Sequence, residues 1–256
     1  MDNKVTGKRA AIHFEYDWLK YVLVILASIF LCYFLFTQIN ATRESEKLDI
    51  FFATYKSYLS EETFESEIKN AVNKDAKNKI RDVNITFADP LDSDYGSTST
   101  SNAYTADIMI LSESDMKDYG HWFVELTPEI LAEFVPEGME LEYFTYNPEE
   151  IDPDTQNRIG KNYGIRVDKL LNIDNSTLDE PPFIFDCVAN YEREGWEDQI
   201  TEEMRKYDNK FYLVFPTGGT KIGKYGKDKD YQHLKHSFTF VRYFLERFNT
   251  ATVSGE

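Results

Sequence analysis

The chain opens with one long apolar stretch. Between residues 21 and 42 no side chain carries a formal charge, and most are Val, Leu, Ile or Phe. At a rise of about 1.5 Å per residue, a helix of this length reaches about 33 Å, which matches the roughly 30 Å hydrocarbon core of a bilayer. We therefore predict an N-terminal segment over residues 1–18 followed by a single transmembrane helix over residues 19–42.

Basic residues are concentrated before this stretch. The early cluster is Lys4, Lys8, Arg9 and Lys20, and only Arg43 and Lys47 follow shortly after the apolar run. The positive-inside rule then predicts a protein of the cell membrane with a cytoplasmic N-terminus and an extracytoplasmic domain over residues 43–256. A cleaved secretory signal is the alternative, although the run is long for a signal and no small-x-small cleavage site follows it.

The first part of the remaining chain alternates between strand and helix patterns. Residues 49–53 form a short apolar run, residues 83–87 alternate apolar with polar positions, and residues 106–111 are apolar enough for a central strand. Between the first two, Ser60 is placed to cap a helix whose buried stripe is Phe64, Ile68 and Val72. This rhythm predicts an α/β domain with right-handed crossovers and a mainly parallel sheet.

The second part shows fewer regular patterns. Thr127 and Pro128 are typical of a helix start, and strands are expected near residues 163–167 and 211–215. Residues 147–154 and 172–182 are rich in Asn, Asp and Pro and are expected to be loops. A final helix is indicated by apolar positions spaced by three and four: Leu234, Phe238, Val241, Leu245 and Phe248.

The net charge of the chain argues against nucleic acids as binding partners. The chain holds 45 acidic against 28 basic residues, a net charge of −17 at pH 7. Phosphate backbones repel such a surface, so we expect no nucleic-acid binding. Cys187 is the single cysteine after the apolar stretch, which excludes a disulfide within the domain.

Two motifs come close to ion or phosphate sites. Residues 218–225 nearly match the phosphate-binding loop G-x-x-x-x-G-K-[ST], but Tyr225 stands where Ser or Thr would ligate magnesium. A hairpin or loop is the favoured interpretation. Asp92, Asp94 and Gly96 resemble part of a calcium loop that lacks its closing Glu. We therefore predict no cofactor and no metal.

No arrangement of residues indicates catalysis. His233 and His236 lie one helical turn apart, but no Cys or further His accompanies them, and partly exposed surface histidines are expected. Neither a nucleophile elbow nor an H-E-x-x-H pair is present. The sequence predicts a protein that is not an enzyme, with no catalytic residues.

Three segments, 106–111, 123–127 and 160–165, resemble stretches of the extracellular solute-binding proteins of ABC importers, in particular the sugar-binding branch. They are an Ala-Asp-Ile strand opening, a Leu-Thr before a helix, and Gly-Lys-x-Tyr-Gly-Ile. The resemblance implies a periplasmic-binding-protein-like fold. It also implies capture of a sugar or other small polar solute, or an accessory role beside the permease subunits of an importer.

The sequence departs from that family in two ways. Arg166 stands where the family usually has proline. Little chain is left for a second lobe, so a reduced second lobe is expected over residues 147–205. Because solute capture in this family closes two lobes over the ligand, the departure concerns function more than fold.

A ligand is expected at the carboxyl ends of parallel strands, where aromatic rings, hydroxyls and carboxylates suit a polyol. The predicted ligand-binding residues are Tyr55, Asp92, Tyr95, Ser112, Glu113, Trp122 and Tyr163. In the alternative interpretation they are structural: Ser114 caps a helix, Asp92 shapes a turn, and Tyr55 and Trp122 pack.

Two further functions stay open. One is a non-catalytic, membrane-anchored interaction or assembly protein that has lost the ligand cleft. The other, less favoured, is an exported enzyme that uses clustered carboxylates. Ligand-dependent thermal stabilisation discriminates solute capture from the interaction protein, and turnover abolished by changing one carboxylate would identify the enzyme.

Overall fold

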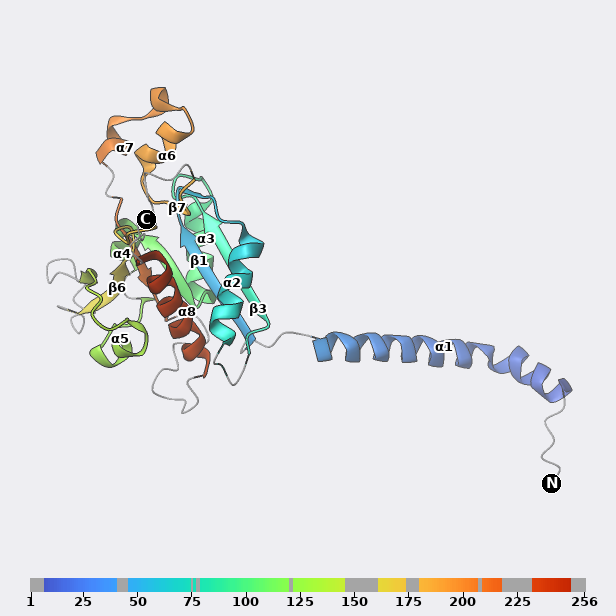
Figure 1. The fold of residues 1–256 in the computed structure, drawn as a ribbon. Coiled ribbons are helices and arrows are strands. Elements are labelled where there is room, and N and C mark those ends of the chain that lie inside the picture. Colours follow the sequence, from blue (N-terminus) through green and yellow to red (C-terminus); the bar gives the residue numbers. More distant parts are fainter. Residues whose placement is uncertain are drawn as a thin grey trace, which may run out of the picture. The chain divides into compact units, whose positions relative to one another are not determined.

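The computed structural model describes residues 7–40, 46–74, 76, 79–119, 122–145, 161–173, 180–206, 209–217 and 232–249. The chain divides into two compact units, Met1–Arg43 and Glu44–Glu256. The first unit contains one helix, and the second contains the sheet and the helices that cover it (Figure 1).

Helix α1 spans Gly7–Asn40 and begins well before the predicted start at residue 19. Its segment Asp17–Thr37 has a mean hydropathy of 2.3 and is long and apolar enough to cross a membrane. The hydroxyls of Ser28 and Thr37 donate to the carbonyls of Val24 and Tyr33 one turn earlier. These bonds satisfy the Ser28 and Thr37 hydroxyls within the helix itself.

The second unit is built on a six-stranded sheet in the order β3-β1-β4-β8-β6-β5. The strands are β1 (Lys47–Ala53), β3 (Asp82–Ala88), β4 (Ile108–Ser112), β5 (Tyr143–Thr145), β6 (Asn162–Arg166) and β8 (Phe211–Val214). All the strands that the hydrophobic pattern indicated are present. Strand β4 is buried at every position and lies inside the sheet, which confirms the predicted central strand.

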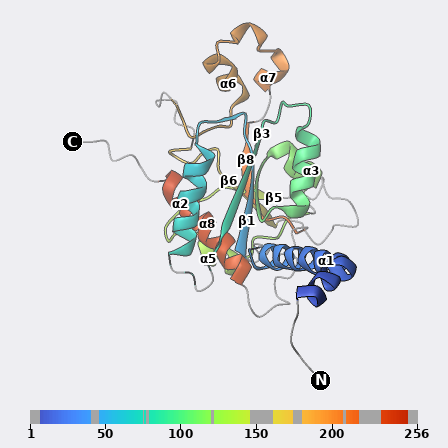
Figure 2. The ribbon, with the colours of Figure 1, turned by 90° about the vertical axis from the view of Figure 1, so that its right-hand side faces the viewer.

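Strands β3, β1 and β4 form the parallel part of the sheet. The chain leaves β1 through α2 (Glu61–Asn73) to β3, then returns through α3 (Tyr95–Thr105) to β4 on the other side of β1. Viewed along the sheet edge, α2 and α3 lie on opposite faces (Figure 2). This doubly wound arrangement follows from two right-handed crossovers that run in opposite directions along the sheet.

The predicted α/β domain with a mainly parallel sheet is confirmed, and two strands run against the majority. Strand β8 is antiparallel to both β4 and β6, and β5 is antiparallel to β6. Four of the six strands therefore share one direction, while β8 and β5 run the opposite way. The fold is mixed α/β with a mostly parallel sheet.

The helix predictions are largely confirmed. In α2 the stripe Phe64, Ile68 and Val72 is buried, although the Ser60 side chain makes no capping hydrogen bond. Helix α5 spans Pro128–Phe134, and the Thr127 hydroxyl accepts from the Ile130 N–H as predicted. Helix α3 was not predicted, because its sequence of Ser, Thr, Asn and Gly lacks an apolar period.

Helix α8 (Gln232–Asn249) supplies much of the core on the face that it shares with α2 (Figure 2). Of the predicted stripe, Phe238, Val241, Leu245 and Phe248 are buried, and so are Phe240 and Phe244. The expectation of a partly exposed His236 is wrong, because that residue is only 6% exposed. Contacts with α2 on one side and α5 on the other bury a wider stripe than a surface helix has.

The segment predicted as a reduced second lobe is divided between two places. Its residues 162–166 are strand β6 of the main sheet. Residues 183–206 form strand β7 (Phe183–Ile184), helix α6 (Cys187–Arg193), a 3-10 helix, η5 (Glu197–Gln199), and α7 (Glu202–Lys206). The loop expected at 147–154 lies outside the described residues, as do residues 174–179 of the loop expected at 172–182.

Candidate functional site

The carboxyl ends of β1, β3 and β4 meet at one end of the sheet, and the strand order reverses there between β1 and β4. In a doubly wound sheet this is the position at which a ligand crevice is expected. The chain segments that arrive there are Thr54 and Tyr55 after β1, Asp89 after β3, and helix α4 (Glu113–Tyr119) after β4. The residues that follow these three strands therefore lie at one end of the sheet, as the parallel pairing requires.

A short second sheet closes this end. Strand β2 (Lys56–Ser57) pairs antiparallel with β7. The N–H of Tyr55 donates to the Ile184 carbonyl at 2.9 Å, and the buried Thr54 hydroxyl lies 2.8 Å from the same oxygen. In Figure 1, β7 lies at this end of the sheet with α6 and α7 beyond it. The protein's own backbone thus occupies hydrogen-bonding groups that a ligand would otherwise meet.

Aromatic packing fills the space beneath β7. The Phe183 ring is fully buried and stacks on Phe52, with centroids 5.1 Å apart and planes 10° apart, and on Phe185 at 5.8 Å and 13°. Tyr55 is 3% exposed and lies edge-on to Phe211 at 5.9 Å. Tyr55, which was predicted to bind a ligand, is a core residue, as the alternative interpretation that it packs in the interior expected.

Two predicted site residues, Tyr95 and Ser112, are brought together by Asp115 of α4. The Tyr95 hydroxyl donates to the Asp115 carboxylate at 2.6 Å, and the Ser112 hydroxyl donates to the same oxygen at 2.7 Å. The Ser112 hydroxyl also lies 3.2 Å from the Asp115 N–H, and the Ser112 N–H lies 3.3 Å from the Asp115 carboxylate. This reciprocal pattern is a capping box, so Ser112 caps α4, where Ser114 was the expected cap.

Asp115 was missed in the sequence, although a signal for it exists. Ser at the cap followed three residues later by an acidic residue is the sequence pattern of a capping box. Both Tyr95 and Ser112 are buried, and Asp115 ties α3 to the start of α4. The cluster therefore fixes two helices at the carboxyl end of β4.

The remaining predicted residues are dispersed. Glu113 forms an ion pair with Lys210 at 3.3 Å, and Asp92 lies exposed in the turn before α3. The Trp122 carbonyl accepts from the Thr217 N–H at 2.6 Å, which places that residue beyond the far end of β8. Tyr163 is 3% exposed inside β6. Trp122 and Tyr163 therefore lie away from the ends of β1, β3 and β4.

Two titratable groups at the carboxyl end, Asp89 and Cys187, have raised pKa values. Burial raises the pKa of Asp89 to about 6, and nearby Asp92 adds to the shift, while a hydrogen bond from the Leu91 N–H opposes it. Burial, with the charges of Asp89 and Asp186, raises the pKa of the Cys187 thiol to about 11. A thiol with so high a pKa stays protonated near neutral pH and is a poor nucleophile.

The described residues offer no metal site. No group of three or more His, Cys, Asp or Glu side chains in that part of the chain is placed to share an ion. Among the groups considered for an ion, Asp92 and Asp94 are exposed and His236 is buried in the core. The loop 218–225 that nearly matches a phosphate-binding motif lies outside the described residues.

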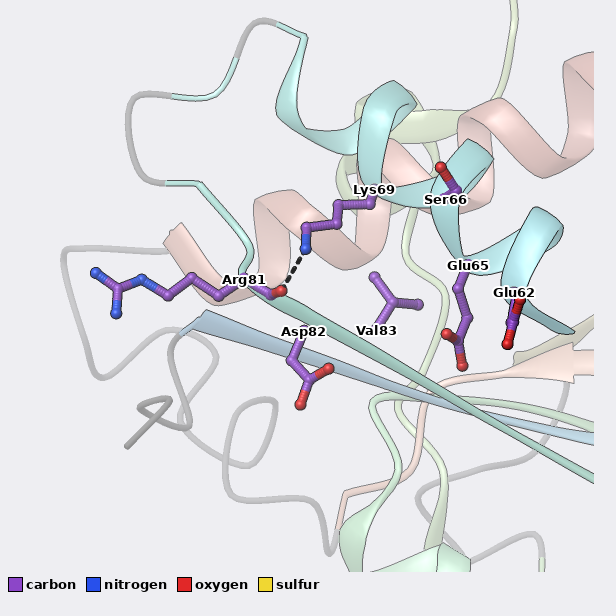
Figure 3. A pocket seen from close by; sticks show the side chains of 7 residues that line it. All are labelled: Glu62, Glu65, Ser66, Lys69, Arg81, Asp82 and Val83. Atoms are coloured by element: carbon purple, nitrogen blue, oxygen red, sulfur yellow. Dashed lines mark hydrogen bonds between the residues drawn. The ribbon is translucent and has the colours of Figure 1, made fainter. Parts of the chain in front are cut away.

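A hollow of about 260 Å³ lies beside the free edge of β3. Helix α2 lines it with Glu62, Glu65, Ser66 and Lys69, and the start of β3 lines it with Arg81, Asp82 and Val83. Figure 3 shows Lys69 extending to the Arg81 carbonyl, to which it donates at 2.6 Å, and Glu65 directed toward the strand. The hollow is polar and charged, unlike the aromatic packing at the carboxyl ends.

Burial raises the pKa of Glu65, and the neighbouring charges of Glu61, Asp82 and Glu62 raise it further. A hydrogen bond from the Ile85 backbone N–H opposes this shift. This hollow was not predicted, because its side chains come from a helix and from the strand that follows it and form no recognisable sequence motif.

Comparison with protein-family models, with characterised proteins and with solved structures finds no match for this chain. The resemblance to solute-binding proteins of importers therefore stays a prediction.

Proposed function

We propose that the chain is a non-catalytic, membrane-anchored interaction protein, whose α/β domain lies outside the cytoplasm and binds other proteins rather than a small solute. Helix α1 provides the anchor. Its apolar segment Asp17–Thr37 is long enough to span a bilayer, and the early cluster of Lys and Arg favours a cytoplasmic N-terminus.

The observation that carries the proposal is the closure of the carboxyl end of the sheet. Solute sites of this class bury most of the ligand's surface in a concave pocket. Here Phe183 occupies the space above Phe52, and Ile184 takes the hydrogen bonds of Thr54 and Tyr55. A solute would have to displace buried aromatic packing before it reached those groups.

The chemistry at the same end supports a protein without turnover. Asp115 is occupied by Tyr95 and Ser112, Glu113 is paired with Lys210, and the Cys187 thiol is protonated at neutral pH. A nucleophile needs an adjacent base and a general base needs a reachable proton. Each of these groups is instead engaged in holding α3, α4 or α6.

The test is a thermal-stability screen of the full-length chain in detergent against sugars, oligosaccharides, amino acids and inorganic anions. A ligand at a hundred times its dissociation constant would stabilise by about 2.7 kcal/mol, a shift of several degrees for a domain of this size. We expect no solute to produce such a shift. In parallel, lysine-reactive crosslinking in intact membranes is expected to yield a discrete adduct with another protein.

The competing function is solute capture for an importer. A micromolar solute that stabilises the wild type but not the Tyr95→Phe variant would overturn the proposal in its favour. Tyr95→Phe is the matched change because it removes only the hydroxyl that donates to Asp115. Crosslinking to importer permease subunits in the presence of that solute would complete the case for a receptor.

A further inference from the structure

The two edges of the six-stranded sheet are protected differently. Strand β5 has three residues, and its register against β6 shifts between Phe144 and Thr145. Strand β3 has seven residues, contains no proline, and carries no charged side chain after Asp82. Edge strands are normally kept short, irregular or charged because their open backbone pairs with other chains. Only the β5 edge follows that rule.

The backbone of β3 alternates between its neighbour and the open side. The Ala88 carbonyl accepts from the Thr54 N–H at 3.0 Å and so faces the β1 side. Because successive residues of a strand point their backbone groups in opposite directions, Val83, Ile85 and Phe87 present theirs to the open side. Two side chains of α2 reach this edge: Lys69 donates to the Arg81 carbonyl, and Glu65 accepts from the Ile85 N–H.

We infer that this edge binds the same edge of a second copy of the chain, with the two β3 strands antiparallel about a two-fold axis at Ile85. In that register Ile85 faces Ile85 of the second copy, and Val83 faces Phe87. These are the residues whose N–H and C=O groups point outward, so the pairs exchange hydrogen bonds. The result is one continuous sheet across both copies, through an isologous contact.

The charges along the edge are self-complementary in this register. Arg81 lies four residues before Ile85 and Asp89 four residues after it, so the register sets the backbone of Arg81 in each copy opposite the backbone of Asp89 in the other. Within one copy the Arg81 guanidinium also lies 3.5 Å from the Glu46 carboxylate. The charged residues of α2 obey the same symmetry. Glu62 and Lys69 are seven positions apart on one helical face, with Glu65 and Ser66 at the midpoint beside Ile85. The two-fold axis therefore sets Glu62 of one copy against Lys69 of the other.

The hollow between α2 and β3 gains a role in this arrangement. Three carboxylates, Glu62, Glu65 and Asp82, line it within one copy. Burial is the main cause that raises the pKa of Glu65, and the charges of Glu61, Asp82 and Glu62 add to the shift. The second copy brings the Lys69 ammonium and the Ser66 hydroxyl toward the same space. The carboxylates, which repel one another in a single copy, are then close to the ammonium group and the hydroxyl of the second copy. This pairing is independent of the proposed function, since it holds whether the domain binds a solute or another protein.

The first test uses cysteine crosslinking in the full-length chain with Cys32→Ser. Ile85→Cys brings two thiols together with Cα atoms about 5.5 Å apart, within the range of a disulfide. Asp82→Cys is the matched control, because the register separates the two copies of residue 82 by about 20 Å. Cys187 can stay, because it is buried and its pKa is raised. We expect a disulfide-linked dimer from Ile85→Cys under mild oxidation and none from Asp82→Cys.

The second test exchanges charges on the exposed face of α2, where substitution leaves the core intact. Glu62→Lys and Lys69→Glu each replace two attractive contacts by two repulsive ones, because the axis doubles every change. Each is expected to weaken association about tenfold in sedimentation or crosslinking yield. The double variant Glu62→Lys/Lys69→Glu exchanges the charges and should restore association to within about twofold of wild type.

The inference is overturned if the chain stays monomeric in detergent and in membranes while thermal melts show it folded. It is also overturned if Asp82→Cys crosslinks as well as Ile85→Cys, since the contact is then not in the stated register. A double charge variant that is weaker than either single variant would likewise contradict the pairing of Glu62 with Lys69.

Discussion

The carboxyl ends of the strands and the free edge of β3 are two boundaries of the same sheet with opposite construction. At the carboxyl ends, Phe183, Ile184 and Tyr55 are buried, and the backbone is paired through β2 and β7. Along the β3 edge, a charged hollow adjoins a regular strand, and the side chains of Lys69 and Glu65 of α2 reach its outward backbone. The boundary at which this topology usually binds ligands is closed, and the lateral boundary is open.

This difference suggests that the closed end contributes mainly to folding stability and the open edge mainly to association. Buried aromatic packing contributes strongly to folding, whereas exposed charged groups contribute little to stability and much to specificity. The closed end should therefore respond to mutation with large losses of stability. The open edge should respond with changes in association and with almost none in folding.

The largest effect is expected from Phe183→Ala at the closed end. The ring is fully buried and contacts Phe52, Phe64 and Phe185. Its removal should cost about 3–5 kcal/mol, measured as the loss of unfolding free energy in denaturant. Tyr104→Ala is the control, because that ring is 55% exposed and should change stability far less. A cost below about 1 kcal/mol for Phe183→Ala would mean that the end is not closed as described.

A smaller effect is expected from Thr54→Val, which keeps the shape of the side chain and removes its hydroxyl. That hydroxyl is buried and lies 2.6 Å from the Lys56 carbonyl and 2.8 Å from the Ile184 carbonyl. Leaving buried acceptors without it should cost about 1–3 kcal/mol. Thr86→Val in the open edge strand is the matched substitution and should stay within about 0.5 kcal/mol of wild type. Equal losses of stability at the two positions would mean that the carboxyl ends and the β3 edge do not differ in how strongly they depend on buried hydrogen bonds.

The parallel half of the fold could be predicted because its signals are local. The stripe of Phe64, Ile68 and Val72 and the apolar strand at 108–112 each carry their period within one short segment. The antiparallel half could not be oriented. Strand β8 pairs with β4 across about a hundred residues, and nothing in its own sequence fixes the direction of that pairing. Helix α3 was missed because Ser and Thr compete for backbone hydrogen bonds and weaken the helix signal.

The sequence could predict which strand ends converge, but it could not predict whether that end of the sheet is open to a ligand. Parallel strands bring Tyr55, Asp89 and Ser112 to one end, as the topology rule requires. Whether that end is open depends on Phe183, which stacks on Phe52 although more than a hundred residues separate the two in the chain. A long-range contact of this kind leaves no periodic trace in the sequence. The same is true of the hollow beside β3, which only the packing of α2 creates.

The pH dependence of stability should identify Asp89 at the closed end. Its pKa is raised from 3.8 to about 6 by burial, so the folded state binds the proton more tightly than the unfolded state. The resulting stabilisation is complete below about pH 4 and is lost as the pH rises through about 6. Asp89→Asn keeps an acceptor for the Leu91 N–H and should raise stability at pH 7 by roughly 1 kcal/mol after solvent screening.

The measurement is the denaturation midpoint of wild type and variant between pH 4 and pH 8. The two curves are expected to converge at low pH and to separate above pH 6. Asp94→Asn, an exposed residue before α3, serves as the control and should run parallel to wild type. If Asp89→Asn also runs parallel to wild type, the carboxyl is not held in a dry environment.

The smallest effect on folding is expected at the open edge, where Glu62→Lys and Lys69→Glu should each leave the stability of the single copy within about 0.5 kcal/mol. Glu62 is exposed on α2, and Lys69 makes one exposed hydrogen bond, to the Arg81 carbonyl. Stability must be measured by dilution, because association of two copies adds a concentration-dependent increment to the apparent stability of wild type. At low protein concentration the variants and wild type should have the same unfolding free energy. At high concentration the apparent stability should rise for wild type alone. A loss of several kcal/mol at every concentration would show that these charges hold α2 on the sheet, which would make the β3 edge a structural boundary like the carboxyl ends.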